Sequence, residues 1–208
     1  MAKKPSEKPI PLDPAPAIIA AAMRLAAERS WSEIPLAEIA AAAEVSVGTL
    51  YRLFPSKLAI LNGLVRQVDA AVLAAPVDGA DRPRDRLFDV LMRRFEALVP
   101  SRPALNRIAR DMRRLHLDAL PAAFALRHSM GWMLEASGIA STGWRGMLRT
   151  RWLGLAYLAA FRAFLDDDSI DLTRTMAALD RALRRIEPLL ALPAGEVPPD
   201  TPDHVAAQ

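Results

Sequence analysis

The chain has 208 residues, of which 52% are hydrophobic and 25% are charged, and its formal net charge is +3. A chain of this length and composition can bury a substantial core, which argues against disorder of the whole chain. It contains no cysteine and only three histidines, which excludes disulfide bonds, thiolate metal sites and cysteine nucleophiles.

The N-terminus, MAKKPSEKPIPLDP, lacks the apolar core of a signal peptide. No apolar run approaches the roughly 20 residues that a membrane-spanning helix requires. We therefore expect a cytoplasmic protein without membrane insertion. Residues 1–13 are interpreted as a flexible basic arm.

Apolar residues recur at intervals of three and four, and alternation with period two is absent, which predicts an all-α fold. A first helix is expected after Asp13, a suitable N-cap, and it ends at about Arg29. The residues at 30–32 interrupt the helical pattern. A second helix of about two turns is predicted over residues 35–43.

A third helix is predicted to begin at Ser46, whose hydroxyl can cap it, and to end near Phe54, because Pro55 pushes the residue before it out of helical geometry. Ser56 then caps a linking helix that continues to about residue 75. Three short helices of this kind fit a helix-turn-helix domain at residues 14–60, with residues 46–53 as the recognition helix.

The C-terminal part contains five amphipathic segments, separated by stretches rich in proline, glycine and aspartate. They are predicted at residues 84–99, 104–115, 121–137, 144–165 and 172–190. The tail at residues 193–208, PAGEVPPDTPDHVAAQ, has little to bury and is expected to be disordered.

The recognition helix must present two faces. Leu50 and Phe54 lie four residues apart and are expected to anchor it to the first two helices. The residues left to point outward are small or hydrogen-bonding: Val47, Gly48, Thr49, Tyr51 and Arg52. A small first turn lets the backbone approach phosphates closely.

The order and spacing of these residues resembles the signature of the TetR family of bacterial transcriptional regulators. The matching positions are Val45, Ser46, Gly48, Leu50, Tyr51, Phe54, Ser56 and Lys57. The resemblance implies a homodimer that binds palindromic operator DNA and acts as a repressor released by a small apolar or amphipathic ligand. It also implies that residues 76–192 form a helical ligand-binding and dimerisation domain.

Residue by residue, the resemblance places Ser46, Val47, Gly48 and Thr49 at the major groove and Tyr51 and Lys57 on phosphates. Arg52 would contact a phosphate or a base edge, and arginine to guanine is the commonest specific contact. Four positions depart from the family pattern, namely Ser30, Pro35, Glu44 and Leu53. These departures remove phosphate contacts and place an acid near the DNA, which predicts modest affinity.

The stretch from residue 89 to residue 187 also resembles TetR-like accessory proteins of ubiquinone biosynthesis, which bind lipid. This suggests a lipid-like ligand and leaves an alternative open: a lipid- or quinone-binding accessory protein with a non-functional helix-turn-helix. Candidate pocket residues are the methionines and aromatics that suit a large apolar cavity. They are Phe95, Met112, Phe124, Met130, Trp132, Met133, Trp152 and Tyr157.

The last two long segments carry small and apolar faces that suit a four-helix dimer interface. The candidate interface residues are Gly154, Ala159, Ala163, Met176, Leu179 and Leu183. No nucleophilic side chain stands at a recognisable spacing from a general base, so we expect neither an enzyme nor a cofactor. The acidic run at residues 166–168 is interpreted as a solvated turn and not as a metal site.

Overall fold

The computed structural model describes residues 13–76, 82–115 and 119–191, and every regular element in these ranges is helical. The predicted all-α fold is therefore confirmed. Most of the predicted arm and the whole predicted tail lie outside the described residues. The helices are α1 (Pro14–Glu28), α2 (Leu36–Ala42), α3 (Val47–Leu53), α4 (Lys57–Ala74), α5 (Pro83–Leu98), α6 (Arg102–Leu115), α7 (Ala119–Ala136), α8 (Gly143–Leu165) and α9 (Thr173–Leu190).

Side-chain caps fix the starts of the first helices. Asp13 accepts a hydrogen bond from Ala15 N (3.0 Å), Ser46 accepts one from Thr49 N (3.0 Å), and Ser56 accepts one from Ala59 N (3.1 Å). Each cap satisfies a backbone donor that the helix itself leaves without an acceptor. The interruption expected after α1 is a single 3₁₀ turn, Trp31–Glu33.

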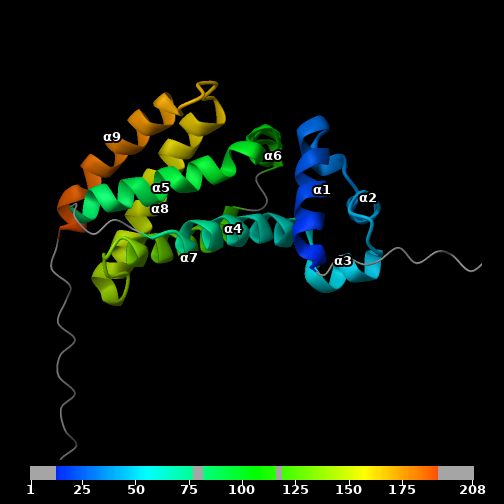
Figure 1. Ribbon diagram of the computed structural model, residues 1–208, viewed down its shortest axis with the longest axis horizontal. Coiled ribbons are helices and arrows are strands. Elements are labelled where there is room, and N and C mark those ends of the chain that lie inside the picture. The colour runs from blue at the N-terminus through cyan, green and yellow to red at the C-terminus, as the bar shows by residue number, and fades with distance from the viewer. Residues whose placement is uncertain (1–12, 77–81, 116–118, 192–208) are drawn as a thin grey trace, which may run out of the picture.

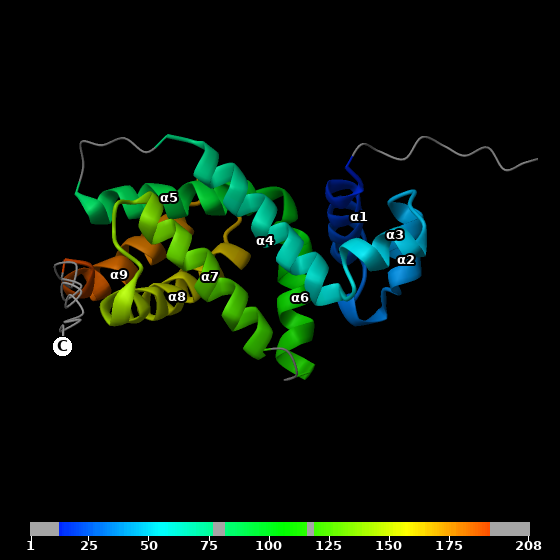
Figure 2. The same cartoon turned by 90° about the horizontal axis from the view of Figure 1, so that it is seen from below.

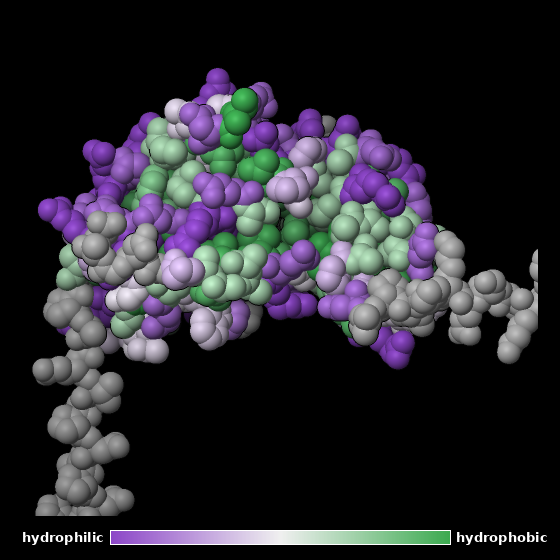
Figure 3. Space-filling view, in the orientation of Figure 1, coloured by the Kyte–Doolittle hydropathy of each residue, from purple (hydrophilic) through white to green (hydrophobic). Residues whose placement is uncertain are grey.

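The helices form two groups, with α1, α2 and α3 gathered at one end of the molecule (Figures 1 and 2). α4 runs from this end into the larger group formed by α5 to α9, and α8 packs along α9. α6 packs against α1 and so joins the two groups a second time. Apolar side chains reach the surface in the middle of the molecule, between its two ends (Figure 3).

No helix within the described ranges has both the length and the apolar character that crossing a membrane requires.

Close packing joins α4 to the small group. Gly63 faces the ring of Phe54, and a Cβ atom at this position would lie 2.6 Å from the ring and 3.1 Å from Ile19 Cδ1. Because real Cβ contacts are never that short, glycine lets α4 lie directly on the core of the α1–α3 group. α4 is therefore in direct contact with Phe54, the C-cap residue of α3.

The turn between α8 and α9 differs at one residue from the solvated turn expected from sequence, because Asp166 and Asp168 are exposed but Asp167 is buried. Asp167 is fully buried, and its Oδ2 accepts hydrogen bonds from Thr175 N (2.8 Å) and Thr175 Oγ1 (2.7 Å). Burial alone would raise the pKa of Asp167, but hydrogen bonds from Ser169 and Thr175 outweigh burial and lower it to about 2. The carboxylate therefore stays ionised and holds the start of α9.

Candidate nucleic-acid interface and ligand pocket

The two faces of α3 are as different as the sequence predicts. Leu50 and Phe54 are buried against the other helices of the small group. Val47 and Tyr51 are 54% and 68% exposed, although both are large and apolar or aromatic. Large side chains held outward on a short helix form a surface suited to a partner.

A hydrogen-bond network orders the polar side chains on the outer face of α3. Ser46 Oγ lies 2.9 Å from Thr49 Oγ1, and Arg52 Nη2 lies 3.5 Å from the same hydroxyl. The guanidinium is thus held beside the hydroxyl instead of extending freely into solvent. Its remaining donors stay available to a base edge or a phosphate.

Gly48 is not explained by packing inside the chain, because a Cβ atom there would meet nothing closer than Ser46 Oγ at 3.8 Å. The missing side chain instead leaves the outer surface of α3 open to close approach from outside.

Glu44, in the turn before α3, has a φ of +56°. This left-handed conformation favours glycine and costs other residues roughly 1 kcal/mol. Two further departures from the family pattern also have visible consequences, because Pro35 gives α2 no side-chain cap and Leu53 is exposed.

Lys57, predicted to bind phosphate, is tied to the protein itself. Its Nζ donates hydrogen bonds to Trp31 O (2.5 Å) and Ser32 O (3.2 Å) and lies 5.3 Å from the centre of the Trp31 ring. Burial lowers the pKa of Lys57. Two of its three donors therefore stabilise the turn between α1 and α2, and the sequence pattern alone does not show this structural role.

Comparison with known protein families gives a match for the α1–α3 group and the start of α4. Residues 18–64 match the family described as bacterial regulatory proteins, tetR family. This part of the chain is therefore similar to the N-terminal domain of TetR-family regulators. The comparison with curated proteins found no match.

Solved structures of TetR regulators share the fold of nearly the whole chain. A TetR transcriptional regulator from Rhodococcus sp. RHA1 is 23% identical with a TM-score of 0.62, covering 88% of this chain and 97% of its own. A TetR regulator from Nitrosomonas europaea ATCC 19718 is 24% identical with a TM-score of 0.63, and the match covers 82% of this chain and 96% of that one. FadR of Thermus thermophilus, a TetR-family repressor solved with lauroyl-CoA, is 22% identical with a TM-score of 0.51, and the match covers 88% of this chain and 98% of that one.

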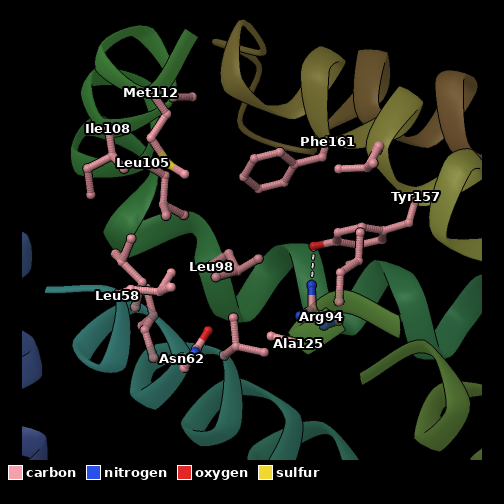
Figure 4. A pocket seen from close by; sticks show the side chains of 16 residues that line it. Leu58, Asn62, Arg94, Leu98, Leu105, Ile108, Met112, Ala125, Tyr157 and Phe161 are labelled. Carbon is pink, nitrogen blue, oxygen red and sulfur yellow. Dashed lines mark hydrogen bonds between the residues drawn. The ribbon is translucent and has the colours of Figure 1, made fainter. Parts of the chain in front are cut away.

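A pocket of about 220 Å³ lies in the larger group of helices, next to the α1–α3 group (Figure 4). Its walls come from α4, α5, α6, α7 and α8. The apolar lining includes Leu58, Leu61 and Val65 of α4, Leu105, Ile108 and Met112 of α6, and Phe161 of α8. α4 leaves the recognition helix at Ser56 and enters the pocket wall within its first turn.

The structure brings only part of the predicted pocket set to this cavity. Met112 and Tyr157 line it, whereas Phe124 lies outside the residues with described side chains. Five other residues of the predicted set do not line this pocket. Phe95, Met130 and Met133 are fully buried in the core, Trp152 is exposed, and Trp132 lines a separate hollow beside His128. Core and pocket residues share the same helical spacing, so the sequence pattern does not separate them.

One polar cluster closes the end of the pocket nearest α5. Arg94 Nε donates a hydrogen bond to Asp69 Oδ1 (2.9 Å), and Arg94 Nη1 donates one to the Tyr157 hydroxyl. Burial opposes the charge on Arg94, but Tyr157 and Asp69 outweigh it and raise the pKa of the guanidinium. Burial raises the pKa of the Tyr157 hydroxyl. The cluster therefore contains an ionised arginine and a neutral phenol at neutral pH.

α6 connects the pocket to the α1–α3 group through Asp111. Its Oδ2 accepts hydrogen bonds from Ser30 Oγ (2.8 Å) and Trp31 N (2.7 Å), while Ile108 and Met112 on the same helix line the pocket. A shift of α6 on ligand binding would therefore pull on the turn that also holds Lys57.

Replacing Asp111 by alanine is expected to lower the free energy of unfolding by about 1.5–3 kcal/mol, because a partly buried backbone donor loses a charged acceptor. Urea unfolding followed by circular dichroism measures the change. The exposed Asp89, on α5, provides a matched control, and Asp89→Ala should leave the unfolding free energy unchanged. Equal effects of the two substitutions would show that the Asp111 contact contributes nothing.

The outer face of α8 carries an apolar stripe along most of the helix. Its exposed members are Trp144, Met147, Trp152, Leu155 and Leu158. They recur at intervals of three to five residues and so lie on one side of the helix. A row of large apolar side chains of this length marks an interaction surface.

This stripe corrects part of the predicted dimer interface. Leu179 and Leu183 are fully buried inside their own subunit and cannot meet a second copy. Gly154 has little exposed surface of its own, but a Cβ atom there would meet nothing within 4 Å, so the space in front of it is open. Ala159 and Met176 are exposed, and Ala163 is half-buried. α9 therefore turns its leucines toward α8 of the same chain, and the larger apolar area lies on α8.

Proposed function

We propose that the protein is a sequence-specific, DNA-binding transcriptional regulator that acts in the cytoplasm as a homodimeric repressor, without enzymatic activity. The single observation that carries this proposal is the outer face of α3: an ordered Ser46, Thr49 and Arg52 network beside a strongly exposed Tyr51 on a TetR-family domain. That arrangement suits a helix that enters the major groove.

In this proposal residues 14–60 bind the operator and residues 76–192 bind the ligand and the second subunit. Ser46, Val47, Gly48 and Thr49 face the groove, Arg52 reads a base edge, and Tyr51 contacts phosphate. Lys57 retains one free donor for a phosphate while its other two hold Trp31 and Ser32. The basic arm, with Lys3 and Lys4, adds further phosphate contacts.

The position of the pocket supports release by a ligand. Leu58 and Leu61 lie just after the cap of α4, so a ligand between them and α6 would displace the helix that follows α3. Gly63 packs on Phe54, which carries the displacement to the recognition helix. Operator affinity falls only if the ligand binds the displaced geometry more tightly than the DNA-bound one.

The alternative, a lipid-binding accessory protein with a non-functional helix-turn-helix, is less well supported. A relic domain has no reason to retain a capped α3 with Tyr51 and Arg52 outward. The structures described above are those of transcriptional regulators.

A mobility-shift assay against DNA flanking the protein's own gene tests the regulator proposal. Arg52→Ala is expected to weaken specific binding by about tenfold to a hundredfold, the loss typical of one bidentate base contact, and Tyr51→Ala should weaken binding to all sequences. Affinity of the unchanged chain should fall steeply as salt rises. Arg107→Ala, an exposed arginine on α6, is the control and should bind as the unchanged chain does. Binding without sequence preference, unaltered by Arg52→Ala, would refute the proposal.

A further inference from the structure

The pocket has a definite polar end. Of its 16 lining residues, Asn62, Arg94 and Tyr157 alone carry nitrogen or oxygen in their side chains. Figure 4 shows Leu105, Ile108 and Met112 of α6 across the cavity from Arg94 and Tyr157, with Phe161 stacked beside Tyr157 on α8. A ligand that fills the pocket therefore meets hydrocarbon on most of its surface and polar groups on one side.

The positive charge of Arg94 is already compensated inside the protein. The side chains of Arg94 and Asp69 are 3% and 12% exposed, and their closest atoms are 2.9 Å apart. A buried ion pair of this kind presents no net charge to a ligand. An added carboxylate would be a third buried charge without a partner of its own, which is strongly unfavourable in an apolar cavity.

Besides the N–H groups of Arg94 that make no hydrogen bond within the described part of the chain, two further hydrogen-bonding groups remain for a ligand. Because the guanidinium of Arg94 only donates, the Tyr157 oxygen is its acceptor, and the hydroxyl proton finds no acceptor among the described residues. The raised pKa of Tyr157 keeps that proton in place at neutral pH. The side-chain amide of Asn62 likewise makes no hydrogen bond within the described part of the chain, although it lines the pocket.

Building on the proposed regulatory function, we infer that the pocket takes an uncharged, mainly hydrocarbon ligand with one carbonyl or similar acceptor oxygen, held by the Tyr157 hydroxyl and the Asn62 amide. Its volume of about 220 Å³ sets the size. A closed apolar cavity of about 150 Å³ holds benzene, so this pocket suits a single ring with a short chain, or a chain of similar bulk.

Three probes of nearly equal size test the ligand class by titration calorimetry on the full-length chain. Butyrophenone carries one ketone, butylbenzene lacks the oxygen, and phenylbutyrate carries a carboxylate. The ketone is expected to bind about threefold to tenfold more tightly than the hydrocarbon, the value of one or two hydrogen bonds, and the carboxylate is expected to bind weakest.

Variants assign the preference to the two groups. Tyr157→Phe should reduce ketone affinity to nearly that of butylbenzene without changing butylbenzene itself. Asn62→Leu should reduce ketone affinity and leave hydrocarbon affinity equal or higher, which provides a second test if Tyr157→Phe folds poorly. Gln67→Leu is the matched control, because it makes the same kind of change on an exposed residue of α4, and it should leave all three affinities unchanged.

Equal binding of ketone and hydrocarbon, tightest binding of the carboxylate, or no binding of any probe would overturn the inference. The operator-binding assay is independent of these titrations. Arg52-dependent DNA binding without ketone preference would therefore refute the ligand class alone, whereas loss of both results would refute the regulator proposal.

Discussion

Replacing Asp69 by alanine is expected to lower the free energy of unfolding by about 3–5 kcal/mol, the usual cost of leaving one charge of a buried ion pair without its partner. The loss is this large because Arg94 is buried and cannot turn toward water. The guanidinium cannot lose its charge by deprotonation either, since the pKa of an arginine is far above neutrality. Denaturant unfolding at neutral pH measures the change.

The double substitution Asp69→Leu with Arg94→Met should recover most of that stability, because both charges disappear and apolar side chains of similar volume replace them. Glu38→Ala serves as control, since it breaks an ion pair with Arg29 that is open to solvent, and no measurable loss is expected. If Asp69→Ala proves as harmless as Glu38→Ala, the pair is not buried in solution.

The second large effect concerns assembly. Leu155→Asp places a charge in the middle of the apolar stripe on α8, at a position 53% exposed in the single chain. We expect a folded monomer, because the substitution disturbs no core contact. We also expect operator affinity to fall by about a hundredfold or more, because the two half-sites of the operator are no longer bound by one dimer. Sedimentation equilibrium and the shift assay measure the two results.

Leu73→Asp is the matched control for this prediction. Leu73 lies on α4 and is also exposed, but it is not part of the stripe. It should leave both the oligomeric state and the operator affinity unchanged. If the Leu155→Asp protein remains a dimer, the apolar stripe on α8 is not the dimer interface.

The sequence predicts the helices well because their ends are set locally. Asp13, Ser46 and Ser56 bond to backbone groups two or three residues away, so the caps can be recognised without any tertiary information. The two faces of α3 can also be predicted locally, because Leu50 and Phe54 lie four residues apart and so share one inner face. The other large apolar side chains of this stretch, Val47 and Leu53, are exposed.

Contacts between distant segments could not be predicted in this way. Asp69 and Arg94 are 25 residues apart, and Tyr157 is 63 residues beyond Arg94, so no short pattern signals their cluster. On α8 and α9 apolar residues occupy more than one face, and spacing alone does not say which face meets the chain's own core. One local signal for the pocket was present, because Asn62 interrupts the apolar series of α4.

Leu158 belongs to two surfaces at once. It lines the pocket, and it is also 43% exposed on the stripe proposed to meet the second subunit. If a second copy packs over α8, it also covers the outer side of this pocket wall. Ligand occupancy and subunit association then become linked equilibria, so that ligand affinity should depend on protein concentration below the dimer dissociation constant.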